Sequence, residues 1–185
     1  MFLSVVSIIK IVFLLVLLFC VMMGTFGSQF RIKNGDTRYY LYKIEGNGFL
    51  RYYSDMTFGC SGVDRNFDAS LAFAIFAWLA ILIGTVLAVI ALFRANLLPA
   101  IVGVILAGVA FVCLLISWAL VAALYNENYC GNNGFKGGAK YDYGFAFLVI
   151  SWLGTMLWGL FEVLSLQNMI PNANQKISTS STSAA

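Results

Sequence analysis

Two charged side chains lie inside long apolar runs of this sequence, and they are the first candidates for chemistry. Lys10 interrupts the run Leu3–Phe26, and Glu162 lies near the end of the run Tyr143–Leu166. An ionisable residue at membrane depth is costly, so it commonly marks an ion or proton pathway. Each residue also lies near an end of its run, where a long side chain can reach the interface. We expect snorkelling or packing roles for both, with a proton or ion role as the alternative.

The four cysteines fall into two pairs. Cys20 and Cys113 lie within apolar runs, where a free thiol behaves as a small hydrophobic group. Cys60 and Cys130 lie in two polar segments, which an even number of membrane crossings places on the same side. We expect these two cysteines to form a disulfide, with two free thiols as the alternative.

The composition argues against several classes of function. The chain has no histidine, which is the commonest general base and a common metal ligand. The polar segments contain no carboxylate cluster at metal-ligand spacing, and the formal net charge of +3 comes without a basic stripe. We therefore expect no enzyme activity, no metal, no cofactor and no nucleic-acid partner.

Four apolar runs must position these side chains. Of the 185 residues, 61% are hydrophobic and 10% are charged, and the mean hydropathy is +0.88. Soluble domains carry about 25% charged residues, and a membrane-spanning helix needs about 20 apolar residues. We expect a four-helix membrane domain over residues 1–170, with spans at about 3–26, 69–93, 97–124 and 143–166. The first run also has features of a signal peptide, so its cleavage is the alternative to its retention.

The second and third runs are separated by only three residues and should form an antiparallel hairpin. Small residues recur in them at four-residue spacing, as Gly84 with Ala88 and Gly103 with Ala107. In lipid this pattern lets two helix backbones approach closely, so we expect the two helices to pack on each other. Residues 171–185 form a polar, low-complexity tail that we expect to be disordered.

The polar segment 29–68 holds 11 of the 19 charged residues. Within it, Asn47-Gly48 is a strong hairpin signal flanked by residues that favour strands. We expect a hairpin that pairs Tyr39–Ile44 with Phe49–Tyr53. Because a lone hairpin is marginally stable, further strands are expected near residues 30–33 and 57–60 and from the second polar segment, 125–142.

The aromatic residues of this hairpin have two interpretations. They could form a belt where the hairpin meets lipid headgroups, or a recognition surface, since tyrosine is enriched at interfaces. The residues concerned are Tyr39, Tyr40, Tyr42, Phe49, Tyr52 and Tyr53.

Four spans place both termini on one side of the membrane and both polar segments on the other. The polar segments carry 8 of the 11 lysines and arginines, and a bare count would place them in the cytoplasm. Three features favour the opposite: the first run is typical of a signal anchor, a folded segment is not a short connector, and paired cysteines require an oxidising compartment. We expect segments 29–68 and 125–142 to be extracellular and both termini to be cytoplasmic.

Several short motifs resemble those of the amastins, surface proteins of trypanosomatid parasites within the claudin-like four-transmembrane superfamily. They follow the first span, close the third and open the fourth: Gly24-Thr25, Ser28-Gln29-Phe30-Arg31, Ile116-Ser117-Trp118-Ala119, Tyr125, Cys130, Tyr143-Gly144-Phe145-Ala146-Phe147 and Ser151-Trp152. The first polar segment departs from the family pattern of two cysteines flanking a tryptophan–glycine core. It has no tryptophan and one cysteine, Cys60, followed by Ser61-Gly62.

The resemblance implies an α-helical membrane protein, a four-transmembrane-helix bundle with a small extracellular antiparallel β-sheet cap. It implies a non-enzymatic, multi-pass protein of the plasma membrane that acts in adhesion, host or membrane interaction, or membrane organisation. The partners implied are the lipid bilayer, a lipid or sterol, other membrane proteins or copies of itself in the same membrane, and a host or opposing-cell surface. The alternative function is a transporter or channel-associated subunit that handles lipid, sterol or ions.

Overall fold

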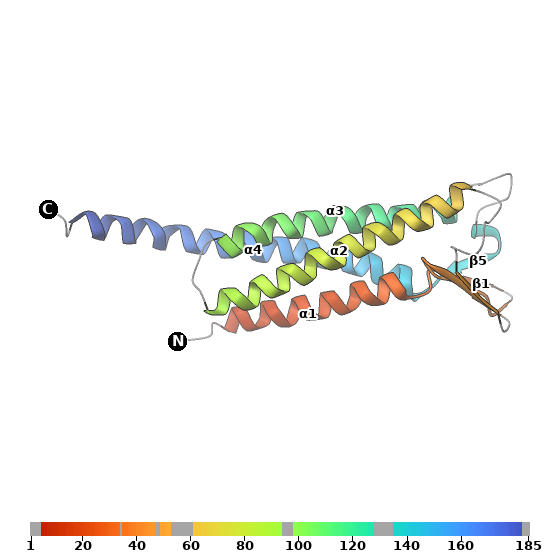
Figure 1. The fold of residues 1–185 in the computed structure, drawn as a ribbon. Coiled ribbons are helices and arrows are strands. Elements are labelled where there is room, and N and C mark those ends of the chain that lie inside the picture. The colour runs from red at the N-terminus through yellow and green to blue at the C-terminus, as the bar shows by residue number, and fades with distance from the viewer. Residues whose placement is uncertain are drawn as a thin grey trace.

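Four long helices run side by side in the computed structural model, which describes residues 5–33, 35–46, 49–52, 61–93, 98–127 and 135–182 (Figure 1). Each helix contains an apolar stretch long enough to cross a bilayer. The predicted four-helix membrane bundle is therefore confirmed. The helices are α1 (Val5–Phe26), α2 (Ser61–Phe93), α3 (Leu98–Asn126) and α4 (Tyr143–Thr182).

Buried residues recur along the helices at alternating intervals of three and four, which is the spacing of a coiled-coil seam. Many of them are alanine, glycine or serine, so the helix backbones can approach closely. In this way α2 packs along α3, and α4 packs against both α1 and α3. In α3 the seam residues are Ala100, Gly103, Ala107, Ala110, Leu114, Ser117, Val121 and Leu124. In α2 they include Val63, Phe67, Ser70, Ala74, Ala77 and Ile81.

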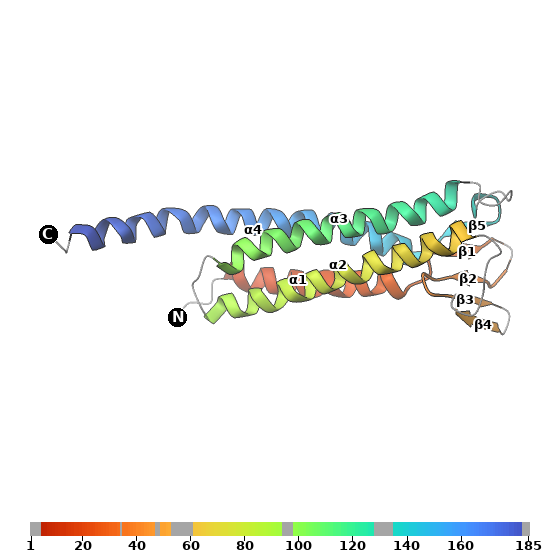
Figure 2. The same ribbon diagram turned by 45° about the horizontal axis from the view of Figure 1, so that its top comes forward.

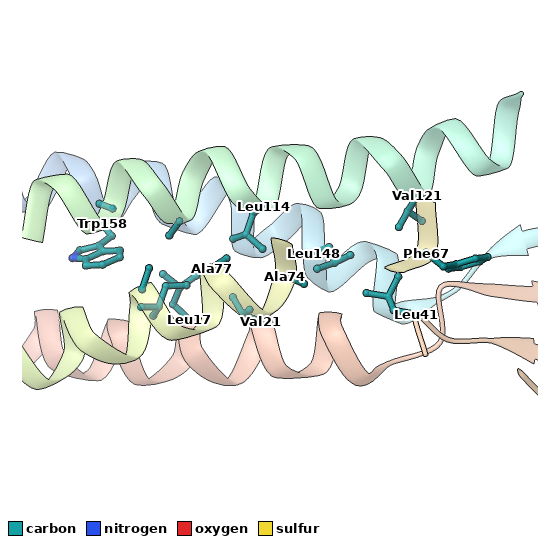
Figure 3. Packing of buried hydrophobic residues seen from close by; sticks show 14 of the residues in the cluster. Leu17, Val21, Leu41, Phe67, Ala74, Ala77, Leu114, Val121, Leu148 and Trp158 are labelled. Carbon is teal, nitrogen blue, oxygen red and sulfur yellow. The ribbon is translucent and has the colours of Figure 1, made fainter. Parts of the chain in front are cut away.

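The outward faces of the helices are as apolar as the interior. Phe76, Ile105 and Leu160 are 58%, 60% and 59% exposed, respectively. Exposure of so many large apolar side chains is costly in water and favourable in lipid. Figure 3 shows the contrasting interior, where Leu17 and Val21 of α1 lie near the small side chains of α2.

The helix α2 begins eight residues earlier than the span expected from residue 69. Val63 and Phe67 extend the same seam toward the N-terminus, and both are buried. Asp64 lies in the first turn, where a carboxylate interacts favourably with the helix dipole. The polar start of this helix is therefore held by packing and by a favourable terminal charge.

The helix α4 continues to Thr182, through residues for which disorder was expected. The chain contains no glycine after Gly159, so it lacks the residue that most often ends a helix in the left-handed conformation. The helix bounds therefore include residues 171–182, and the expected disorder of this tail stays a prediction.

A five-stranded antiparallel sheet lies beyond one end of the bundle, and α1 begins and α4 ends at the other (Figures 1 and 2). Its strand order is β4-β3-β2-β1-β5, which confirms the predicted antiparallel sheet. We call these strands, together with the short 3-10 helix η2 (Phe135–Gly137), the cap. The strands are β1 (Phe30–Ile32), β2 (Arg38–Tyr39), β3 (Lys43–Gly46), β4 (Phe49–Tyr52) and β5 (Ala139–Tyr141).

The predicted hairpin is confirmed as the pair β3–β4, in which Gly46 faces Phe49. The expected single strand Tyr39–Ile44 is wrong, because the chain turns after Tyr39 and β2 pairs with β3. The Tyr40 amide donates to the Lys43 carbonyl at 2.9 Å across this turn. The turn carries Leu41, which is fully buried, so burial of this side chain prevails over a continuous strand.

Two of the expected additional strands are also present. Residues near 30–33 form β1, and the second polar segment contributes β5, which pairs directly with β1. The strand expected near residues 57–60 lies outside the described residues.

The two faces of the sheet differ sharply in character. Direct cross-strand partners share a face, and one such row contains Tyr141, Phe30, Tyr39, Ile44 and Arg51. Phe30 and Ile44 are buried, so this row faces the bundle, and the Phe30 ring lies 4.9 Å from that of Phe135. The neighbouring row on the opposite face, which we call the outer row, contains Lys140, Arg31, Arg38, Glu45 and Leu50.

The end of α1 is joined to the start of α4. The Gln29 side-chain amide donates to the carbonyls of Gly24 and Gly27 at 2.7 and 3.1 Å, which satisfies carbonyls at the helix end. The Gly144 amide donates to the Ser28 carbonyl at 2.9 Å. A Cβ on Gly144 would lie 2.7 Å from backbone atoms of Gly27, so this close approach requires glycine.

Candidate functional site

Lys10 of α1 and Glu162 of α4 form an ion pair inside the bundle. The Lys10 Nζ atom lies 2.6 Å from Glu162 Oε1 and 2.7 Å from Oε2. Glu162 is 1% exposed, and Trp158 Nε1 donates a hydrogen bond of 2.9 Å to its Oε1 atom. The carboxylate therefore has both a cation and a neutral donor, as a buried charge requires.

Of the two roles expected for Glu162, snorkelling or packing, its burial in the bundle favours packing. Its position continues the buried series of α4, four residues after Trp158 and seven after Thr155. Lys10 likewise lies four residues before Leu14 and seven before Leu17, in the buried series of α1. This phase is visible in the sequence, and it is the signal that identifies both charges as interior residues.

Two glycines make room for this cluster. A Cβ on Gly84 of α2 would lie 2.3 Å from Trp158 Cζ2, and a Cβ on Gly103 of α3 would lie 2.8 Å from Glu162 Cδ. We expected these residues to let α2 and α3 approach each other. The structure gives them a further role, because the space that they leave is filled by side chains of α4.

A cavity of about 110 Å³ adjoins the ion pair. One water molecule needs about 10–15 Å³ of such space, so the cavity can hold several waters or a small ion. It is lined by Ser7, Lys10, Gly84, Leu87, Ala88, Ala91, Leu92, Pro99, Ala100, Glu162 and Ser165. Two hydroxyls and a paired lysine and glutamate are therefore its polar groups.

The hydroxyl groups of the second and third spans are bonded to protein. Ser70 Oγ donates to the Ser117 carbonyl, and Ser117 Oγ donates to the Ser70 carbonyl, both at 3.0 Å. Thr85 Oγ1 donates to the Ile81 carbonyl within its own helix at 2.8 Å. Ser70 and Ser117 thus fasten α2 to α3 instead of lining the cavity.

Two of the candidate recognition tyrosines belong to the interior of the cap. The Tyr39 ring lies 5.0 Å from that of Phe135, and burial raises the pKa of its hydroxyl. Tyr40 is only 8% exposed. Both side chains support the fold and leave little surface for a partner.

Tyr42 and Tyr52 lie in a series of rings that starts at the end of α1. The Tyr42 ring is 6.1 Å from that of Phe26, the last residue of the helix, and 6.3 Å from that of Tyr52. Lys43 Nζ lies 5.6 Å from the centre of the Tyr42 ring. Aromatic and basic groups gathered at the end of a membrane span favour the belt interpretation for these two tyrosines.

The hairpin presents two exposed apolar residues at its other end. Phe49 and Leu50 of the edge strand β4 are 44% and 48% exposed. β3 runs in the same direction as β1, away from α1, so the start of β4 lies at the end of the sheet remote from the helices. Tyr53, Cys60 and Cys130 lie outside the described residues.

Few of the described side chains are placed to bind a metal ion. Among the described residues, no three histidine, cysteine, aspartate or glutamate side chains are placed to hold a metal ion. The carboxylates of the cap have other contacts: Asp142 accepts from the Ser28 hydroxyl, and Glu45 Oε2 lies 3.3 Å from Lys43 Nζ.

Four spans with a small antiparallel sheet at one end define a multi-pass membrane protein that carries a folded cap at one membrane surface. The chain belongs to the amastin surface glycoprotein family, whose family model matches residues 4–160. It is therefore a multi-pass protein of a surface membrane, in contact with the lipid bilayer. No curated protein matches the chain.

The short motifs that carried the resemblance lie at contacts between elements. Ser28-Gln29 and Tyr143-Gly144 form the junction of α1 with α4. Trp118 and Trp152 place their rings 5.5 Å apart between α3 and α4. These motifs therefore report how the bundle is assembled, and the family resemblance predicted the fold more directly than the function.

Proposed function

We propose that this protein is a non-enzymatic contact protein of the cell surface, whose cap meets a host or opposing-cell surface. The observation that carries the proposal is the exposure of Phe49 and Leu50 at the end of the sheet remote from the helices. These two adjacent side chains point to opposite faces of the edge strand, so a partner that encloses this edge would cover both of them. A contact protein also requires little of its membrane domain beyond a rigid support for the cap.

The geometry below the cap supports this role. The junction at Gln29 and Gly144 fixes the sheet to two helix ends. The rings of Phe26 and Tyr42 meet at the end of the first span, and such aromatic groups are favourable at the level of lipid headgroups. Both features hold the hairpin at a defined height and angle. The order of the elements also supports a place in the wider claudin-like group, with strands between the first and second spans and between the third and fourth.

The proposed orientation places both polar segments outside and both termini in the cytoplasm. It is supported by membership in a family of surface glycoproteins, because the cap is the folded part of the chain beyond the bilayer. We also propose that α1 is retained. Its removal would leave Glu162 buried without its cation, which is strongly unfavourable.

We further propose a disulfide between Cys60 and Cys130. The hydroxyls of Ser70 and Ser117 fix the register of α2 against α3. From this point each helix continues nine residues toward the cap, to Ser61 in α2 and to Asn126 in α3. Equal extensions of antiparallel helices support neighbouring positions for the cysteines, which come one residue before Ser61 and four residues after Asn126. Such a bridge stabilises by about 2–4 kcal/mol.

Cell adhesion tests the proposed function. The full chain is expressed on cells that lack it, and attachment to opposing cells is compared for wild type, the double variant Phe49→Ser/Leu50→Ser and the control Asp36→Asn. Surface amounts are matched with a tag at the C-terminus. We expect the double variant to lose most of the added attachment and the control to keep it. Equal attachment by all three would overturn the proposed contact.

Transport of an ion, lipid or sterol is the second candidate function, and the cavity beside Lys10 and Glu162 favours it. Transport would require the ion pair to open, because both charges are committed to each other. Solute flux into proteoliposomes that contain the purified chain tests for transport. Flux that is present in wild type and absent in Glu162→Gln would establish transport, whereas no flux above that of empty liposomes would exclude it for the solutes tested.

A further inference from the structure

The outer row of the cap places three cations side by side on neighbouring strands. Arg31 of β1 pairs with Arg38 of β2 on one side and with Lys140 of β5 on the other. Like charges directly opposite each other destabilise a sheet. Charge on an edge strand can protect against aggregation, which would explain Lys140 but not the two arginines, because β1 and β2 are interior strands.

Further cations extend this patch at one end. Lys33 Nζ lies 3.5 Å from the carbonyl oxygen of Lys136, which brings these two exposed lysines together beside β1 and β5. One carboxylate lies in the row itself: Glu45 of β3 is directly opposite Arg38, and it is shared with Lys43, which lies 3.3 Å away. Arg31 lies 3.9 Å from Asp36, whose side chain is 85% exposed, and in the described part of the chain Lys140 has no carboxylate within ion-pair distance.

We propose that the outer row binds a linear polyanion of the sulfated polysaccharide class. Neighbouring strands lie about 4.8 Å apart, so the three cations form a line of about 10 Å on one face of the sheet. Guanidinium groups bind sulfate and carboxylate through paired hydrogen bonds. Each exposed contact alone is weak, so a ligand with many linked charges gains far more from this line than a single ion does.

The same face argues against a lipid surface as the ligand. Membrane-binding surfaces combine cations with apolar side chains that enter the headgroup region. In β5, β1 and β2 the outer row offers only cations, and the apolar Leu50 is separated from them by Glu45. This inference rests on the proposed function and names the chemistry of the surface that the cap meets.

A direct binding measurement tests it with the full chain in nanodiscs of zwitterionic lipid. Heparin is the probe, and unsulfated dextran of similar length is the negative control. We expect binding that weakens with salt, and the variant Arg31→Gln/Lys140→Gln should bind at least tenfold more weakly. The matched variant Arg51→Gln/Arg65→Gln loses the same charge away from the outer row, since Arg51 lies on the opposite face of the sheet and Arg65 in α2, and it should bind within about threefold of wild type.

Each other outcome overturns the inference. Equal weakening in both double variants would mean attraction to net charge alone, and binding only to vesicles that contain phosphatidylserine would make the ligand a membrane. Thermal unfolding excludes misfolding as a cause, since removal of opposed like charges should leave the midpoint unchanged or raised. Failure of heparin binding with adhesion intact would reject the polyanion and leave the proposed function standing.

Discussion

Lys10 Nζ and Glu162 Oε1 lie 2.6 Å apart, although the two residues belong to the first and last helices of the chain. The Trp158 indole donates a hydrogen bond to the same carboxylate, and Gly84 and Gly103 leave the space that Trp158 and Glu162 occupy. The contact between Lys10 and Glu162 is the one ion pair within the membrane domain among the described residues. The ion pair therefore joins the first helix of the bundle to the last.

Removal of one partner should cost much more than removal of both. We expect Lys10→Met to destabilise the protein by about 3–5 kcal/mol, because it leaves a buried carboxylate without its cation. The double variant Lys10→Met/Glu162→Gln keeps an acceptor for Trp158 and should recover most of this loss. Denaturant unfolding in detergent measures both, with Lys136→Met, at an exposed lysine of the cap, as the control. A double variant no more stable than the single one would show that the pair is not coupled.

Alanine should have opposite effects at two kinds of glycine. At Gly84 the new methyl group meets the Trp158 ring at 2.3 Å, so we expect Gly84→Ala to destabilise by about 1–3 kcal/mol. At Gly108 of α3 nothing lies within 4 Å, and Gly108→Ala should stabilise by about 0.5–1 kcal/mol through helix propensity. Thermal unfolding of the two variants compares them directly, and the same sign at both positions would contradict the geometry.

The serines that join α2 to α3 should be energetically coupled. In a double-mutant cycle of Ser70→Ala and Ser117→Ala we expect a coupling between about 0.6 and 1.7 kcal/mol, which are the average and the largest values found for hydrogen bonds between membrane helices. A cycle of Ser70→Ala with Thr85→Ala is the control, because Thr85 bonds within its own helix. Its coupling should be near zero. Equal couplings in the two cycles would contradict a specific interaction between Ser70 and Ser117.

Thiol labelling should report both the disulfide and the orientation. If Cys60 and Cys130 are paired outside the cell, a membrane-impermeant maleimide will label intact cells only after reduction. The variant Cys60→Ser/Cys130→Ser should then show no labelling, which excludes Cys20 and Cys113 as the source. Labelling without reduction would mean free thiols, and labelling that requires permeabilised cells would reverse the proposed orientation.

The contacts that Glu45 makes within β3 and with the turn between β2 and β3 should weaken in acid. The hydrogen bond from Lys43, and then one from Tyr40, lowers the pKa of the Glu45 carboxyl below its usual 4.5. A folded-state pKa below the unfolded value stabilises at higher pH, so this contribution is complete above pH 4.5 and is lost as the pH falls through the folded value. Amide signals of β3 should follow this titration in wild type and lose it in Glu45→Gln. Asp36→Asn should titrate as wild type does.

The sequence predicted the parts of this fold that depend on local pattern. Apolar length predicts the four helices, and Asn47-Gly48 predicts the hairpin. The break after Tyr39 was missed because it depends on where Leu41 is buried, which is a property of the assembled cap. The extension of α4 to Thr182 has no signal in the polar, low-complexity composition of this segment.

The candidate site was predictable residue by residue but not as a cluster. Lys10 and Glu162 were identifiable as intramembrane charges, and their phase with neighbouring buried residues indicates the interior. Their pairing spans 152 residues of sequence, so no local pattern contains it. The outer row is equally non-local, because Lys140 reaches Arg31 only through the pairing of β5 with β1.

The pairing of β5 with β1 has a consequence for biosynthesis. The ribosome delivers α1 and β1 first, whereas β5 and α4 emerge last. Until they arrive, Lys10 lacks its carboxylate within the bilayer and β1 lacks its neighbour outside it. Insertion of the fourth helix thus completes both the ion pair in the membrane and the sheet outside it. A chain that stops before this helix has an unpaired lysine in the bilayer and an unpaired strand outside it, and membrane quality control can recognise both defects.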